Sequence, residues 1–170
     1  MTHEISFQII QQRSPLFKLI EEAFNSKINA LYDNQCSTLE KLTKLDDRYC
    51  EIMFIESQSA GFLIYKRALQ QEFGLKDAFE LKTLFVFNPE KNARRGIGSL
   101  LFRRANALAL GKKAECIYST VVAQNIPIIS CATKNGFIIT MHGQDITQNQ
   151  RKNYPLETNE LLLVKYSNTL

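Results

Sequence analysis

The segment from residue 78 to residue 111 constrains the fold of this chain more than any other part. AFELKTLFVF (78–87) is rich in the apolar and aromatic residues that strands favour, and Asn88-Pro89 ends it. A polar loop with two glycines follows. It leads straight into an apolar helical pattern at about 97–111, for which Gly111 is the expected C-cap. A strand that passes through a glycine loop into a helix indicates a mixed α/β protein.

The loop at the start of this helix has the features of an anion-binding site. Gly96 and Gly98 lack a Cβ, so their backbone can approach a ligand closely and adopt positive φ. The first turn of a helix leaves N–H groups without intrahelical partners, and the helix dipole adds partial positive charge, which together suit a pyrophosphate. Arg94 and Arg95 add two guanidinium groups, and Ser99 adds a hydroxyl. Glycines in such loops often serve steric needs alone, so this segment by itself leaves both roles open.

Two nucleotide-binding motifs are excluded by the residues around these glycines. No Gly-Lys-Ser/Thr follows the loop, so it is not a Walker A motif. Leu101 occupies the position at which the dinucleotide-binding fingerprint requires a third glycine. The loop therefore needs another explanation.

The N-terminal half shows a strand, two helices and a pair of strands. Residues 5–10 (ISFQII) are typical of an opening strand, and Ser14-Pro15 predicts a helix start with serine as the cap. A second helical stretch is expected at about 37–45. Strands at 48–57 and 61–69 then follow, with Ser-Gln-Ser-Ala-Gly between them as the predicted hairpin turn.

The C-terminal half continues the alternation of strands and helices. The expected elements are a strand at 115–122, a short helix at about 125–135, a strand opening with Gly136-Phe137, a polar loop over most of 141–159 and a last strand at 160–167. This order predicts helices packed on a largely antiparallel sheet. We find neither repeats nor a linker-like tract, so we expect a single domain over residues 1–170.

Val121, Asn125 and Gly136-Phe137 follow the glycine loop at defined distances: Val-x-x-x-Asn, then Gly-Phe eleven residues after the Asn. Together with Ala93–Gly98, this arrangement resembles the acetyl-CoA-binding half of the GCN5-related N-acetyltransferases (GNATs). The resemblance covers about residues 48–140 and is strongest from 84 to 137. It implies a central, mostly antiparallel, twisted sheet of about six or seven strands flanked by about four helices.

The resemblance also implies which residues bind acetyl-CoA. In GNATs the signature Gln/Arg-x-x-Gly-x-Gly/Ala binds the pyrophosphate through backbone N–H groups, and the strand before it separates from the next strand to admit the pantetheine arm. The residues to which this assigns cofactor contacts are Phe85, Val86, Arg94, Arg95, Gly96, Ile97, Gly98, Ser99 and Asn125.

The groups that would transfer protons are less well marked. Glu80 lies on the same strand between apolar neighbours and is the candidate general base; the alternative is an exposed strand carboxylate paired with Lys82. Many family members carry a tyrosine seven residues after the asparagine that protonates the leaving thiolate, and here that position is Ala132. Tyr118 is the candidate replacement, with a core position as the alternative. The signature also departs at Ala93, where glutamine or arginine is usual.

Composition narrows the function classes further. Lys and Arg outnumber Asp and Glu by 21 to 17, and the basic residues occur as scattered pairs, so we do not expect a nucleic-acid partner. Apolar runs are too short to cross a bilayer, and the N-terminus lacks the pattern of a signal peptide. The four cysteines lack the two-residue spacing of zinc or thiol redox motifs. We therefore expect a cytoplasmic protein with reduced thiols, no metal site and no membrane association.

The sequence supports two functional hypotheses. The first is an N-acetyltransferase that moves the acetyl group of acetyl-CoA to a primary amine of a small molecule or peptide by direct attack. The second is a GNAT-like module that binds CoA without turnover and acts as a sensor or interaction protein, which the alanines at 93 and 132 motivate. The acceptor is not readable from the sequence, and a homodimer is expected only by analogy with the family.

Overall fold

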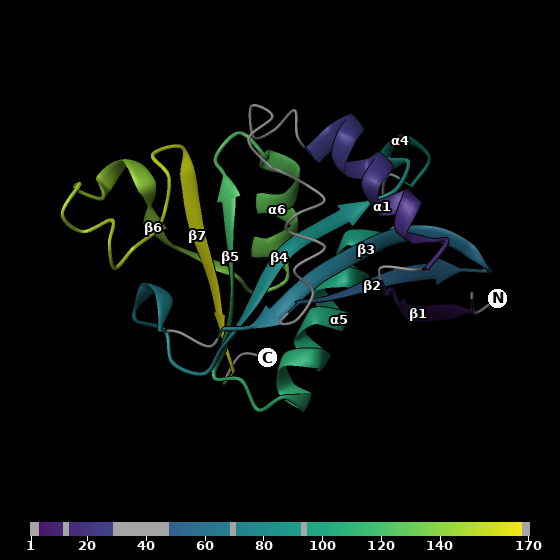
Figure 1. Ribbon diagram of the computed structural model, residues 1–170, viewed down its shortest axis with the longest axis horizontal. Coiled ribbons are helices and arrows are strands. Elements are labelled where there is room, and N and C mark those ends of the chain that lie inside the picture. Colours follow the sequence, from purple (N-terminus) through teal and green to yellow (C-terminus); the bar gives the residue numbers. More distant parts are fainter. Residues whose placement is uncertain (1–3, 12–13, 29–47, 69–70, 93–94, 168–170) are drawn as a thin grey trace. The chain divides into compact units, whose positions relative to one another are not determined.

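The computed structural model describes residues 4–11, 14–28, 48–68, 71–92 and 95–167 (Figure 1). The predicted helix at 37–45 and the residues Ala93 and Arg94 lie outside this part of the chain. The contacts of the chain divide it into two compact units. The first is Met1–Tyr65 with Thr83–Leu101, and the second is Lys66–Lys82 with Phe102–Leu170.

Seven strands and four α-helices are present among these residues. The strands are β1 (Ile5–Ile9), β2 (Arg48–Ile55), β3 (Gln58–Arg67), β4 (Ala78–Val86), β5 (Cys116–Val122), β6 (Ile138–His142) and β7 (Glu160–Tyr166). The helices are α1 (Phe17–Ala23), α4 (Pro89–Asn92), α5 (Ile97–Gly111) and α6 (Ile126–Lys134), with shorter helical turns η1 (Phe24–Ile28), η2 (Glu72–Gly74) and η3 (Gly143–Asp145).

The strands form one sheet in the order β1-β2-β3-β4-β5-β7-β6. The β4–β5 pair is parallel, whereas β1–β2, β5–β7 and β6–β7 are antiparallel. The predicted mixed α/β fold, with a mostly antiparallel sheet of six or seven strands and about four helices, is confirmed.

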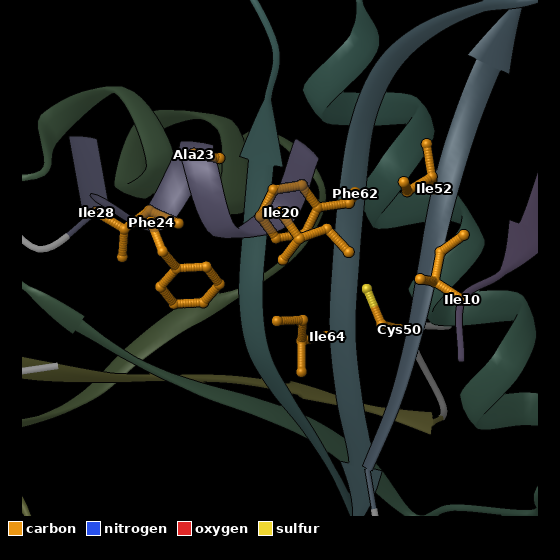
Figure 2. Close-up of a cluster of buried hydrophobic side chains, with 9 residues drawn as sticks. All are labelled: Ile10, Ile20, Ala23, Phe24, Ile28, Cys50, Ile52, Phe62 and Ile64. Atoms are coloured by element: carbon orange, nitrogen blue, oxygen red, sulfur yellow. The ribbon is translucent and has the colours of Figure 1, made fainter. Parts of the chain in front are cut away.

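The core of the first unit forms where α1 and η1 pack on β2 and β3. Ile20 and Phe24 recur at helical spacing, so both point to one side, where they belong to one buried cluster with Phe62 of β3 and Ile52 of β2 (Figure 2). The rings of Phe24 and Phe62 lie 6.2 Å apart. Each fully buried side chain of this size contributes about 1.5–3 kcal/mol, so this cluster is a main source of the unit's stability.

The β2–β3 hairpin differs from the sequence prediction. The turn consists of Glu56 and Ser57 alone, with φ of 50° and 66°, and β3 already runs through Gly61. Two residues with positive φ give a turn whose twist matches the strands it joins. The expected turn at 57–61 was wrong because its small polar residues suit a turn, whereas Gly61 serves packing within the strand.

The start of α1 and the end of α5 test the helix caps that were predicted from single residues. Ser14 Oγ accepts the Leu16 N–H at 3.3 Å in the turn before α1, but the expected helix start at Ser14-Pro15 was wrong, because Leu16 is the N-cap residue and α1 begins at Phe17 without a side-chain capping hydrogen bond. The expected cap at the end of α5 was wrong. Lys113, with φ of 55°, takes the left-handed position, and Ala114 N–H donates to Ala109 O at 3.0 Å. This is a Schellman ending with lysine in place of the usual glycine.

The second unit is organised around β5 and β7, which pair over seven residues from Cys116↔Tyr166 to Val122↔Glu160. β6 joins the other side of β7 with a register shift between Ile139 and Met141. One face of these strands carries a buried cluster that includes Tyr118, whose ring meets Phe73 edge-on at 5.6 Å. The predicted elements at 115–122, 125–135 and 160–167 are therefore present within a residue or two.

Candidate functional site

The segment between β4 and α5 belongs to the first unit, and two side-chain hydrogen bonds lie in its described part. Asn92 Nδ2 donates to Phe87 O at 2.6 Å, and Arg95 Nη1 donates to Asn92 Oδ1 at 3.1 Å. Gly96 O accepts the Leu100 N–H at 3.0 Å, which makes Gly96 the residue that caps α5. The N–H groups of Ile97 and Gly98 lie in the first turn of the helix, where backbone donors generally lack intrahelical partners. The helix start thus has the donors that an anion requires.

Glycine occurs at positions 61 and 96 for different structural reasons. A Cβ on Gly61 would lie 2.5 Å from Phe85 O and 2.9 Å from Leu101 Cδ1, so packing within the unit requires glycine there. Gly96 has φ of 71°, is exposed, and has no atom of the described residues within 4 Å of the position of a Cβ. No neighbour in this part of the chain makes a side chain at 96 impossible. The left-handed backbone and the open space above it are instead the properties expected where a ligand approaches.

Phe85 and Val86, the predicted pantetheine residues, have different surroundings. The ring of Phe85 lies 5.3 Å from that of Phe62 and packs against the core of the first unit. Phe87 N–H donates to Ala60 O at 2.9 Å, which directs the backbone of Phe87 towards β3. Because backbone groups alternate in direction along a strand, Phe85 shares that direction and Val86 has the opposite one. Val86 therefore presents its backbone on the side away from β3.

In the second unit, β4 and β5 pair only at their beginnings. The described register contains the pairs Ala78↔Cys116, Phe79↔Ile117 and Glu80↔Tyr118. At the next position the Ser119 hydroxyl donates to Leu81 O at 2.8 Å. The described register of the two strands thus ends at Glu80 and Tyr118, although each strand continues. The family resemblance implies a separation of these two strands.

Glu80 lies at this last pair and is buried, with 4% of its surface exposed. Its Oε1 is 2.7 Å from Lys82 Nζ, and its Oε2 is 3.3 Å from Lys66 Nζ. Oε2 is itself buried and accepts no hydrogen bond from the residues the structure describes. The expected pairing of Glu80 with Lys82 is confirmed. The expectation that the paired carboxylate would be exposed was wrong, because Glu80 is buried.

Tyr118 faces the same side as Glu80, because register partners on adjacent strands point to one face. Its hydroxyl donates to Glu72 Oε2 at 2.8 Å, and its side chain is fully buried. Burial, the neighbouring Glu80 carboxylate and the hydrogen bond to Glu72 together hold the pKa of Tyr118 well above its ordinary value. Tyr118 is thus a neutral hydrogen-bond donor between two carboxylates.

Asn125 and Ala132 lie on α6, also in the second unit. Asn125 is the N-cap residue, half-buried, and its side chain makes no capping hydrogen bond. Its O accepts the Ile129 N–H at 3.2 Å. Ala132 is fully buried and has no group that could donate a proton. The helix therefore offers an amide at its start and an apolar surface at the position where many GNATs have tyrosine.

Three polar residues of the second unit were missed at the sequence level. Glu72 bonds to Tyr118, which is 46 residues away in the chain, and Lys66 reaches Glu80 from the neighbouring strand β3. No sequence pattern within a single element predicts either contact. Lys165 is 7% exposed, and burial lowers its pKa. Its Cε and Nζ lie 3.3 Å and 3.5 Å from where a Cβ on Gly136 would be, so the absence of that Cβ makes room for the lysine. An alternating strand pattern would have marked Lys165 as inward-facing, but gives no reason for a cation there.

No group of three or more His, Cys, Asp or Glu side chains that could hold a metal ion occurs among the described residues. None of the helices described is both long and apolar enough to span a membrane.

The predicted site residues thus fall into two sets. Phe85, Val86, Arg95, Gly96, Ile97, Gly98 and Ser99 belong to the first unit, and Glu80, Tyr118 and Asn125 belong to the second. Arg94 lies outside the described residues. The structure brings Glu80 and Tyr118 together as register partners, and it places the glycines at the start of α5.

Comparisons with known proteins agree with this fold. No family model and no curated protein matches the chain. Among solved structures, a GNAT family acetyltransferase from Elizabethkingia anophelis with acetyl-CoA bound has a TM-score of 0.65 at 16% identity, covering 95% of this chain and 97% of that one. An IAA acetyltransferase from Bacillus cereus has a TM-score of 0.65 at 13% identity, covering 96% and 99%.

A third structure of the same fold acts on a protein, according to its name. The ribosomal-protein-S18-alanine N-acetyltransferase from Escherichia coli has a TM-score of 0.62 at 11% identity, covering 96% of this chain and 94% of that one. All three alignments extend over nearly the whole chain, so the likeness is not confined to the glycine loop. The chain has the fold of the GNAT acetyltransferases.

Proposed function

We propose that this protein is an N-acetyltransferase that transfers the acetyl group of acetyl-CoA to a primary amine by direct attack. The fold supports the proposal in general, and solved structures of this fold include one with acetyl-CoA bound. The specific support comes from the residues at the start of α5 and along β4.

Gly96 is the single observation that carries the proposal. Its left-handed backbone and exposure leave open space at a helix N-terminus directly after a strand. Backbone N–H groups at such a terminus suit a pyrophosphate, because they and the helix dipole together stabilise negative charge. We assign this role to the N–H groups of Gly96, Ile97, Gly98 and Ser99, with Arg95 and Arg94 as the neighbouring cations.

The remaining cofactor contacts follow the separation of β4 from β5. A pantetheine arm hydrogen-bonds like a strand, so it can bind along the backbone groups of β4. Val86 suits this better than Phe85, because its backbone points away from β3. Asn125 is proposed to contact the arm through its side-chain amide, which makes no capping bond in the structure.

Glu80 is the proposed base. It is a buried carboxylate at the position where β4 and β5 part, and it already binds two primary ammonium groups, those of Lys66 and Lys82. An acceptor amine is chemically the same group, so a carboxylate that pairs with lysine ammonium can also accept a proton from it. Backbone N–H groups along β4 would then stabilise the oxyanion that forms on the thioester carbonyl oxygen.

Tyr118 is not well suited to be the acid, although it was the sequence candidate. Its proton is engaged by Glu72 at 2.8 Å, and its raised pKa makes it a weak donor. Ala132 cannot donate a proton either. We therefore propose that water protonates the leaving thiolate, while the Tyr118 hydroxyl holds Glu72 in place.

The test has two stages. Calorimetric titration with acetyl-CoA, CoA and ATP should show micromolar binding of the two CoA species and no binding of ATP. CoA release is then followed in the presence of a panel that contains small amines, α-amino acids and peptides with a free N-terminus, because the names of proteins with this fold include a protein N-acetyltransferase. Steady release with any member supports the enzyme. Tight binding without turnover supports instead the non-catalytic CoA-binding module that the alanines at 93 and 132 suggest.

The partner and assembly follow from the same proposal. The acceptor is a small-molecule or peptide amine, and a homodimer is the assembly proposed by analogy with the family. Light scattering of the purified protein decides between monomer and dimer.

A further inference from the structure

Glu80, Lys66 and Lys82 form a cluster of one buried acid and two amines, which we call the Glu80 cluster. The Lys82 amine is 2.7 Å from the carboxylate, a full hydrogen-bonding contact. The side chain of Glu80 is 6% exposed, whereas that of Lys82 is 33% exposed. Lys82 thus holds its amine on the candidate base and is at the same time open to a reagent.

The position of Lys82 along β4 distinguishes it from Lys66. The last described β4–β5 pair is Glu80↔Tyr118, and Lys82 lies two residues beyond it on the face that Glu80 occupies. Lys66 lies on β3, on the other side of β4 from β5, and its side chain is 17% exposed. A thioester that binds where β4 and β5 separate would therefore meet the amine of Lys82 before that of Lys66.

We propose that the protein acetylates its own Lys82 in cis, with acetyl-CoA as the donor and Glu80 as the base. This inference rests on the proposed function, which places the thioester along β4. The Lys82 ammonium gives one proton to Glu80, and its nitrogen then attacks the thioester carbonyl carbon. A C–N bond forms and the C–S bond breaks. The sulfur leaves as CoA thiolate and takes up the second proton that the nitrogen loses, while Glu80 passes its proton to water.

Proximity gives this lysine an advantage over the other lysines of the chain. Its nitrogen is held against a base, so both the encounter and the loss of a proton are prepared before the thioester arrives. A positioned base typically contributes about 10²–10⁴-fold to such a step. Exposed lysines such as Lys91 and Lys134 provide the comparison within the same molecule.

The experiment uses the full chain and acetyl-CoA with a ¹³C-labelled acetyl group, so that new acetylation is distinguished from any acquired during expression. Samples are taken over time, digested, and analysed by mass spectrometry to give an initial rate for each lysine. We expect Lys82 to be labelled at least about 10²-fold faster than Lys91 and Lys134, with a first-order rate independent of protein concentration. Glu80→Gln, which keeps the size of the side chain, should reduce Lys82 labelling to the level of the exposed lysines.

Three results would overturn the inference while leaving the proposed function intact. They are labelling of Lys82 no faster than that of the exposed lysines in protein that binds acetyl-CoA by calorimetry, a rate that rises with protein concentration, and faster labelling of Lys66. Failure of acetyl-CoA to bind at all would instead contradict the proposed function.

Discussion

Replacing Gly96 by valine tests the proposed pyrophosphate site directly. Gly96 has φ of 71°, a conformation that a β-branched residue rarely adopts, and nothing among the described residues blocks the space above it. Valine therefore either forces the helix start to change its backbone or places methyl groups where the pyrophosphate would lie. Hydrogen bonds to a charged group contribute about 1.5–3 kcal/mol each, so losing two of them weakens acetyl-CoA binding by about 3–6 kcal/mol, or about 10²–10⁴-fold.

The same substitution also has a stability cost, and Gly74 provides the matched control for it. Gly74 has φ of 68°, is exposed, and likewise has no described atom within 4 Å of a Cβ position, but it lies in the turn between β3 and β4. Valine in a left-handed conformation costs about 1–3 kcal/mol at either position. For a chain of this size that lowers Tm by about 2–4 °C per kcal/mol. Gly96→Val and Gly74→Val should therefore melt at similar temperatures.

The assay is calorimetric titration of both variants with acetyl-CoA below their melting temperatures. Gly74→Val should bind as the wild type does, and Gly96→Val should show no heat of binding at concentrations that saturate the wild type. Unchanged affinity in folded Gly96→Val would refute the reasoning, because the backbone of the loop could then not be what holds the cofactor. Equal loss of affinity in both variants would assign the effect to strain and not to the site.

Three further predictions concern packing, the phenol and a buried thiol. Gly61→Ala places a Cβ against Phe85 O and should destabilise the protein by about 1–3 kcal/mol in urea unfolding, whereas Gly111→Ala, in open space at the end of α5, should not destabilise it. Tyr118→Phe should lower kcat with the best acceptor only modestly, because water is the proposed acid; a loss above about 10²-fold would make the phenol the acid. Burial raises the pKa of the Cys50 thiol to about 12, so the unfolded chain releases this proton at lower pH than the folded one. The contribution of this thiol to the free energy of unfolding is fully present below the ordinary thiol pKa. It is lost as the pH rises towards 12, by up to about 1.4 kcal/mol per pH unit. Urea unfolding between pH 8 and pH 10.5 should show this slope in the wild type and a smaller one in Cys50→Ala.

Much of the fold follows from patterns that extend over a whole element. The helix at 97–111 was predicted with the bounds the structure shows, because fifteen residues of apolar periodicity are bracketed by glycines. The predicted strands at 78–87, 115–122 and 160–167 agree with β4, β5 and β7 within a residue or two, because their apolar pattern also extends over the whole element. Signals carried by one or two residues were less dependable. Gly111 suggested a helix end, yet Lys113 takes the left-handed position, because the Schellman ending depends on where the last carbonyls find partners.

In the candidate site, too, the features formed by neighbouring residues were predicted and those formed by distant residues were not. The glycine loop was found from sequence because its chemistry is local: a helix start, two glycines and adjacent arginines lie within a few residues. The surroundings of Glu80 could not be found that way. Lys66 reaches it across a hairpin, and Tyr118 and Glu72 meet over 46 residues of chain, so only the register of three strands brings the four groups together. Sequence could name Glu80 as a candidate but could not predict that it is buried between two lysines.

The burial of Glu80 in the Glu80 cluster is evidence about the function of the cluster. Removing charged groups from water costs several kcal/mol for each ion, and replacing such a cluster by apolar residues of similar volume often leaves a protein equally or more stable. The adjacent face of β5 and β7 is already apolar, with Tyr118, Leu162 and Val164 buried, so a hydrophobic residue at position 80 would fit the surroundings. Stability alone therefore does not explain a carboxylate and two amines at the point where β4 and β5 separate. Proton transfer to and from an amine at that point does explain them, which is why both the proposed base and the proposed self-acetylation are placed there.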